Sequence, residues 1–360
     1  MAIVQISQIT NRKGLDINLP QLAGAELGWS TDTRQLYIGN GTLEEGAPVI
    51  GNTEILTEFS DILNFTNTYT YKGEAAGYTV QTGVTAGTPV TLSLQQWLDQ
   101  FASVLDFGAV GDGTTDDTAA INRALYQLYC REVNPQIRRS LFFPAGVYRV
   151  TSAIKIPPYA TLVGEGSNNS LIVMDDGVDD YVARTADSLQ NIGVNIGDAG
   201  AITPQYVTVT DMGFSHLDPT GSVFLVQDAT NCNFNKVGFR GTSTTADLDS
   251  DANGSIGVSF ASTASLVCEQ IVFDGCVFNG LVWAINTNQE TKAVTVCNSQ
   301  FDTLYRGVVL GLAATTNGGP TGTRLVANMF DNIYAEGVIF GSNLDPSLNA
   351  TGHNIFYDVG

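Results

Sequence analysis

The sequence predicts an all-β protein whose larger part is a solenoid of stacked coils. Along that part, a phenylalanine ends a short run of alternating apolar and polar residues at intervals of 25, 39, 23, 29 and 26 residues: Phe214, Phe239, Phe278, Phe301, Phe330 and Phe356. Such intervals are typical of repeat proteins, in which stacked copies bury equivalent positions on one another. We therefore predict that these phenylalanines form a continuous core ladder.

A second observation gives the shape of one coil. In three repeats the phenylalanine is followed by another apolar run, which begins at Gly280, Gly307 or Gly337. Each coil is thus expected to contain at least two short strands separated by Gly or Asn turns. Two polar insertions, 175–200 and 242–255, interrupt the repeat. Loops of this kind leave a solenoid sideways and often carry its contacts.

The third observation is the stretch 104–125, which stands just before the repeat. Its apolar start predicts a strand, and Gly108, Gly111 and Gly113 predict a turn with positive φ. Asp116 and Asp117 then fit the N-terminal cap of an amphipathic helix. We interpret the two carboxylates as caps rather than catalytic groups, and the helix as a cover for the open end of the solenoid.

The chain before this stretch divides into two parts. Residues 1–50 predict a small β-module, with two strands around Thr31-Asp32-Thr33. Residues 51–103 predict a connector, or neck, with short helices at 55–63 and 93–101 and short strands between them. The second helix has one apolar stripe, which packs either on the body or against two further copies around a common axis. Residues 104–360 are the solenoid.

Composition excludes several classes of partner. The 360 residues carry a net charge of −20, which disfavours nucleic acid and anionic membrane surfaces. The sequence has no apolar run long enough to insert in a membrane, and its start lacks the basic residues of a signal peptide. Assembly in a cytoplasm is therefore expected. The five cysteines form no CxxC pair and are expected to be buried and apolar in character, and no cofactor is indicated.

Three motifs carry a resemblance to a known family. The stretch LDFGAVGDGTTDDTAAI at 105–121, followed by LFFPAGVY at 141–148 and GEG at 164–166, resembles the opening of the pectate-lyase-like right-handed β-helix of bacteriophage tailspikes and tail fibres. Residues 27–41 are similar to the N-terminal module of phage tail fibres. The β-helix resemblance concerns fold and not activity, because the glycines and caps of 105–121 carry out no chemistry.

The resemblance implies a right-handed parallel β-helix, a homotrimer and a place in the virion, as a tail or neck appendage. Residues 1–50 would attach to a tail, baseplate or neck protein, and the β-helix would adsorb to polysaccharide of the host surface. An enzyme is the competing interpretation: a capsule- or lipopolysaccharide-degrading hydrolase or lyase. A secreted, non-viral lyase is a third, less favoured because no signal peptide is present. The last residues, 353–360, belong to an ordinary coil, so we also expect the natural protein to continue beyond Gly360.

Candidate site residues are few. Asp302 and Asp331 each follow a ladder phenylalanine, so they are expected to lie on neighbouring coils about 5 Å apart, as two carboxylates of a glycosidase would. The alternative is that they are turn formers. Asp249, Asp251 and Asn253 match the start of a calcium loop, but Phe260 occupies the place of its bidentate glutamate. A plain acidic turn is the alternative there.

Overall fold

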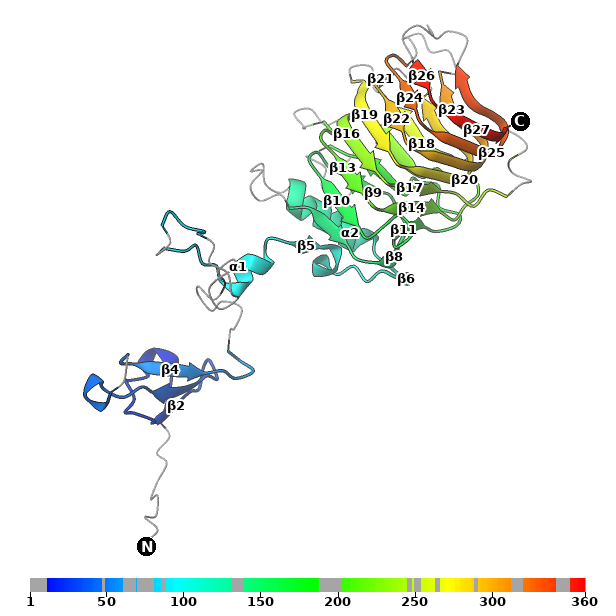
Figure 1. The fold of residues 1–360 in the computed structure, drawn as a ribbon. Coiled ribbons are helices and arrows are strands. Elements are labelled where there is room, and N and C mark those ends of the chain that lie inside the picture. Colours follow the sequence, from blue (N-terminus) through cyan, green and yellow to red (C-terminus); the bar gives the residue numbers. More distant parts are fainter. Residues whose placement is uncertain are drawn as a thin grey trace. The chain divides into compact units, whose positions relative to one another are not determined.

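A computed structural model describes residues 12–46, 49–60, 69, 81–85, 88–130, 139–187, 203–244, 248, 254–262, 266–287, 291–311, 320–340 and 350–359. The chain divides into two compact units, Met1–Gln100 and Phe101–Gly360, each visible in Figure 1. The division falls a few residues before the predicted start of the solenoid at residue 104. No helix in the described ranges is long and apolar enough to cross a lipid bilayer.

The first unit contains a four-stranded sheet. Its strands are β1 (Arg12–Gly14), β2 (Leu27–Ser30), β3 (Leu36–Gly39) and β4 (Asn52–Ile55), and short 3-10 turns lie at Asp16–Asn18 and Leu43–Glu45. The strands expected on either side of Thr31-Asp32-Thr33 are β2 and β3, which pair antiparallel. The helix expected at 55–63 is wrong for its described part. Residue 55 ends β4, which is hydrogen-bonded to β3, and residues 56–60 form a turn.

The second expected helix is present but shorter. It is α1 (Leu94–Leu98), and it begins at a capping box in which the side chains of Ser93 and Gln96 each bond the other's backbone N–H. The apolar stripe is divided between two environments. The Trp97 ring packs against Tyr69 at 5.5 Å between centroids, whereas the Leu98 side chain is exposed.

The start of the second unit differs from the prediction. Residues Val104–Phe107 form a 3-10 turn, not the strand that their apolar residues predicted. Ser103 and Asp106 form a capping box around this turn, and Gly108 closes it with a φ of 90°. The amphipathic helix is present as α2 (Thr118–Leu125), which continues into a π-helical turn at Tyr126–Cys130. Six of the eight α2 residues are buried.

The rest of this unit is a stack of parallel coils, as the repeat predicted, and Figure 1 shows the strands side by side from cyan to red. One parallel sheet contains β5 (Ala102–Ser103), β7 (Leu141–Phe143), β10 (Thr161–Gly164), β13 (Thr208–Thr210), β16 (Thr230–Asn235), β19 (Cys268–Asp274), β21 (Thr291–Lys292), β22 (Thr295–Cys297), β24 (Arg324–Val326) and β26 (Ala350–Gly352).

The other parallel sheet forms the remaining walls of the coils. Its strands are β6 (Asp112–Asp116), β8 (Gly146–Val150), β9 (Ile154–Ile156), β11 (Ser170–Met174), β12 (Ala183–Thr185), β14 (Gly213–His216), β15 (Phe224–Gln227), β17 (Gly238–Arg240), β18 (Ile256–Ala261), β20 (Val277–Thr287), β23 (Gln300–Leu310), β25 (Met329–Phe340) and β27 (Ile355–Val359).

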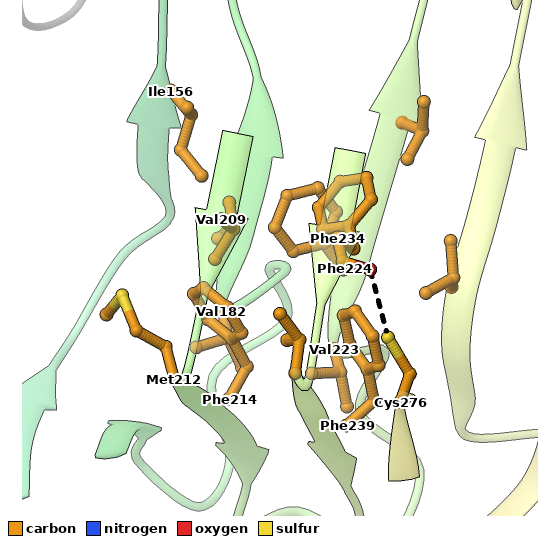
Figure 2. Packing of buried hydrophobic residues seen from close by; sticks show 14 of the residues in the cluster. Ile156, Val182, Val209, Met212, Phe214, Val223, Phe224, Phe234, Phe239 and Cys276 are labelled. Carbon is orange, nitrogen blue, oxygen red and sulfur yellow. Dashed lines mark hydrogen bonds between the residues drawn. The ribbon is translucent and has the colours of Figure 1, made fainter. Parts of the chain in front are cut away.

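The predicted phenylalanine ladder is the spine of the core. The six residues pair in register from β14 to β27. From Phe278 to Phe356 neighbouring rings are stacked with centroids 4.5–4.8 Å apart. Additional rings join the ladder from the opposite walls, among them Phe224 and Phe234 (Figure 2). The core is thus one continuous apolar column rather than separate clusters.

The five cysteines form no disulfide, and three of them are buried in this column, in agreement with their expected apolar role, whereas Cys130 and Cys297 are half-buried. The Cys276 thiol donates a hydrogen bond of 3.4 Å to the Phe234 carbonyl, drawn as a dashed line in Figure 2. Burial raises the pKa of the Cys232 and Cys276 thiols to about 12, so both remain protonated at neutral pH.

A polar ladder runs beside the core at the turn between the two sheets. The Asn328 amide oxygen accepts a hydrogen bond from the Ser299 backbone N–H at 3.0 Å, and the Asn354 amide oxygen accepts one from the Asn328 N–H at 2.9 Å. The Ser299 hydroxyl accepts from the Cys276 N–H at 3.1 Å. The four coils that contain Cys276, Ser299, Asn328 and Asn354 are therefore bonded to one another through side chains as well as through the strands.

Candidate functional site

The opening stretch holds its carboxylates in structural positions. Asp117 is fully buried, and its two oxygens accept hydrogen bonds from the backbone N–H groups of Val110 (2.7 Å) and Gly111 (3.0 Å). We expected this side chain to cap the helix, and it does not. It bonds the preceding turn instead, which comes close because Gly111, at a φ of 70°, lies against the Tyr148 ring.

Asp116 and Asp112 are occupied by their own chain as well. Asp116 accepts from the Thr118 N–H at 3.0 Å and from the Thr151 hydroxyl at 2.8 Å, so it caps the helix and bonds it to the first coil. Backbone N–H groups of Thr115 and Thr114 lower the pKa of Asp112, the first residue of β6, and Gly113 lies in this strand and not in the predicted turn. Both acids thus have a structural role at the start of the second unit.

The register brings Asp302 and Asp331 side by side on β23 and β25, as their spacing from the phenylalanines indicated. Asn279 precedes them on β20, and its amide donates a 3.3 Å hydrogen bond to Asp302. The Thr303 hydroxyl donates to the other oxygen of the same carboxylate at 3.0 Å. All three polar side chains point away from the core, because the neighbouring phenylalanines point into it.

A second outward row runs beside the first on the same strands. It consists of Trp283, Arg306 and Glu336, which are also paired in register. The guanidinium of Arg306 forms a 2.8 Å ion pair with Glu336 and lies 5.2 Å from the Tyr305 ring. We call the two rows together the polar face: Asn279, Trp283, Asp302, Arg306, Asp331 and Glu336.

The polar face has the groups that sugar recognition needs. Carboxylates, an amide and a guanidinium exchange hydrogen bonds with hydroxyls, and the indole ring offers an apolar surface. Two carboxylates on adjacent strands, at a strand spacing of about 4.8 Å, are also near the separation used by retaining glycosidases. The arrangement therefore suits binding of a polysaccharide and is compatible with its hydrolysis.

The calcium candidates Asp249, Asp251 and Asn253 lie outside the described residues. Phe260, which occupies the glutamate position of that motif, is buried in β18 and belongs to the core. Within the described ranges, no group of three or more His, Cys, Asp or Glu side chains is arranged to hold a metal ion.

The sequence reasoning missed one further feature, a polar pocket in the wall of the solenoid. It has a volume of about 320 Å³ and lies between the chain segments that follow β11 and β14. Its charged lining residues are Asp179, Asp180, Arg184 and Asp218. The acidic composition of the 175–200 insertion indicated a loop. It did not indicate which of its residues line a pocket together with residues of the next coil.

Comparison with known proteins gives a match to a family and to individual proteins. The sequence model of the family described as rhamnogalacturonase A/epimerase, pectate lyase-like, matches residues 101–310. A glucan 1,3-beta-glucosidase of Cochliobolus carbonum is 43% identical over 65 residues, which are 18% of this chain and 8% of that protein. A pre-neck appendage protein of Bacillus phage B103 is 35% identical over 82 residues, 22% of this chain and 8% of that protein.

Among solved structures, the pre-mature bacteriophage phi29 gene product 12 aligns with a TM-score of 0.47 at 15% identity, over 71% of this chain and 32% of that one. The matched segments thus span less than a tenth of the two sequence relatives and about a third of the structural one.

Proposed function

We propose that this chain, which belongs to the rhamnogalacturonase A/epimerase, pectate lyase-like family, is a bacteriophage tail or neck appendage subunit that presents its solenoid to host-surface polysaccharide. The polar face is the observation that carries this proposal, since it aligns hydrogen-bonding groups and an aromatic ring along neighbouring coils. The identity to a phage pre-neck appendage protein supports a place in the virion. Attachment would use residues 1–50, and assembly would take place in the host cytoplasm.

The second candidate is a polysaccharide depolymerase. The adjacent carboxylates Asp302 and Asp331, together with the glucan-hydrolase relative, favour it over other activities. In this function one carboxyl group would protonate the leaving glycosidic oxygen, and the other would attack the anomeric carbon to form a glycosyl ester that water then hydrolyses, as in retaining enzymes. Binding and turnover therefore involve the same face, and one set of variants distinguishes them.

We expect the full chain to bind polysaccharide purified from a sensitive host, without release of reducing or unsaturated sugar. Asp302→Asn and Asp331→Asn should each weaken binding by about 10-fold, the effect of one lost charge-assisted hydrogen bond. Glu269→Gln is the matched control, because it removes an exposed carboxylate from β19 in the other sheet.

Sugar release that both aspartate variants abolish would establish the depolymerase instead. If the wild type, Asp302→Asn and Asp331→Asn bind the polysaccharide equally, the polar face is not the binding surface.

A homotrimer completes the proposed function. Leu98, in the helix of the first unit, exposes 41% of its surface, and burial of such apolar area around a common axis would stabilise an assembly. Sedimentation of the full chain at micromolar concentration should give a species of three times 38.2 kDa. Leu98→Asp should dissociate it, whereas a wild-type monomer would contradict the trimer.

A further inference from the structure

The polar pocket is lined by the chain segments that follow β11 and β14, which belong to two successive coils. Residues 177–181 connect β11 to β12 in one coil, and residues 218–222 connect β14 to β15 in the next. Arg184, in β12, lines the pocket as well. Its volume of about 320 Å³ lies within the range of small-molecule sites.

A buried histidine holds the two connections together. His216 has no solvent exposure, and its Nδ1 accepts a 3.1 Å hydrogen bond from the backbone N–H of Asp218. An N–H always donates, so Nδ1 carries no proton and Nε2–H donates to the Asp180 carbonyl at 3.2 Å. Gly221 packs against the imidazole so closely that a Cβ atom added to it would lie 2.2 Å from Nδ1 of His216. The walls of the pocket are thus fixed before any ligand arrives.

The carboxylates in these walls are also held in place. Asp218 accepts from the backbone N–H of Thr220 at 2.8 Å and from that of Gly177 at 3.2 Å. The N–H and hydroxyl of Thr220 lower the pKa of Asp218, which therefore remains ionised at neutral pH. Asp180 accepts from the Ala153 N–H at 3.0 Å. Oδ1 of Asp218 also accepts from the Thr220 hydroxyl at 2.7 Å, and Oδ1 of Asp180 accepts from the Tyr181 N–H at 2.8 Å. One lone pair therefore stays available for a ligand on Oδ2 of Asp218 and on each oxygen of Asp180.

Arg184 is a hydrogen-bond donor in the pocket wall, whereas the two carboxylates are acceptors. Its Nε–H is buried, and among the described residues it has no hydrogen-bond partner. A buried donor without an acceptor is costly, at about 1–3 kcal/mol. Lys155, its neighbour on β9, only adds to the positive charge there. Burial, and then the charge of Arg184, lower the pKa of Lys155. This part of the wall therefore favours an acceptor oxygen that comes from outside the chain.

We propose that the pocket binds one uncharged sugar unit of a host-surface polysaccharide. A sugar hydroxyl donates to a carboxylate and accepts from a guanidinium, so one class of ligand satisfies Asp180, Asp218 and Arg184 together. The lining contains three carboxylates against one guanidinium, and the neighbouring Lys155 ammonium leaves the carboxylates in excess, so the pocket disfavours uronic acids and other acidic sugars. This inference rests on the proposed polysaccharide-binding function, but it places a second subsite away from the polar face.

The test uses the labelled full chain on an array of neutral hexose oligosaccharides and uronate-containing oligosaccharides of matched length. We expect binding to neutral members and none to uronates. Arg184→Met, which keeps the apolar stem, and Gly221→Ala, which displaces the loop from the imidazole, should each reduce neutral binding by about 10-fold or more. Gly352→Ala is the matched glycine control, because nothing lies within 4 Å of its added Cβ.

Thermal unfolding of each variant distinguishes a lost site from a lost fold. The pocket proposal is wrong if the chain prefers uronate-containing oligosaccharides. It is also wrong if a folded Arg184→Met protein binds the neutral oligosaccharides as strongly as the wild type does. These results differ from failure of the proposed function, in which the wild-type chain binds no host polysaccharide. If host polysaccharide binding depends on Asp302 but not on Arg184, the polar face stands and the pocket proposal is wrong.

Discussion

Replacing Phe301 by alanine is expected to reduce the free energy of unfolding of the solenoid by about 3–5 kcal/mol. The side chain has no solvent exposure and lies between two parallel rings, with centroids 4.8 Å from Phe278 and 4.5 Å from Phe330. Loss of the ring leaves a cavity in a column that cannot collapse, because the strands on all sides hold the coil spacing. Urea unfolding followed by circular dichroism measures the change.

Phe356→Ala is the matched control for this prediction. It removes the same ring from the same ladder, but Phe356 is 50% exposed and, among the described residues, its ring stacks on Phe330 alone, at 4.8 Å. Its loss should cost about 1–2 kcal/mol, since less apolar area leaves water on folding. Equal losses in the two variants would show that the ladder does not act as a packed core.

Replacing Asp117 by alanine is expected to cost about 3 kcal/mol. The carboxylate is the acceptor for two backbone N–H groups of the turn that lies against Tyr148, and alanine would leave both without a partner. The turn at 108–111 should open, exposing one end of the apolar column. Hydrogen exchange at the Val110 and Gly111 amides, together with urea unfolding, measures both effects.

Asp112→Ala serves as the comparison for Asp117. Asp112 also accepts two backbone N–H bonds, at 2.8 and 2.7 Å, but it is exposed, so water can replace the carboxylate. Its stability loss should be small, and exchange at Val110 and Gly111 should be unchanged. A loss as large as that of Asp117→Ala would mean that burial is not the reason for the importance of Asp117.

Much of the fold was predictable from sequence, because a solenoid repeats one residue type at one structural position. Phe278, Phe301 and Phe330 show the core in the sequence itself, and the amphipathic pattern after residue 117 shows the helix. Residues 104–107 were interpreted wrongly for a local reason. Their apolar composition is typical of a strand, but the side chains of Ser103 and Asp106 bond backbone N–H groups and favour a 3-10 turn.

Only those candidate site residues that follow the phenylalanine repeat could be predicted from the sequence. Asp302 and Asp331 could be placed together because each follows a ladder phenylalanine at the same offset. The pocket could not be found in this way. Arg184 and Asp218 come from different coils at different offsets, and their meeting depends on the path of two connections around His216.

The polar ladder at the turn between the sheets has a mechanical consequence. Its hydrogen bonds, like those between the parallel strands, run from one coil to the next along the stacking direction. A force along that direction therefore acts on both sheets and on the amide of Asn328 or Asn354 at the same time. Rupture of one coil interface requires many bonds to fail together, so the stack behaves as a stiff rod that transmits a load from one end to the other.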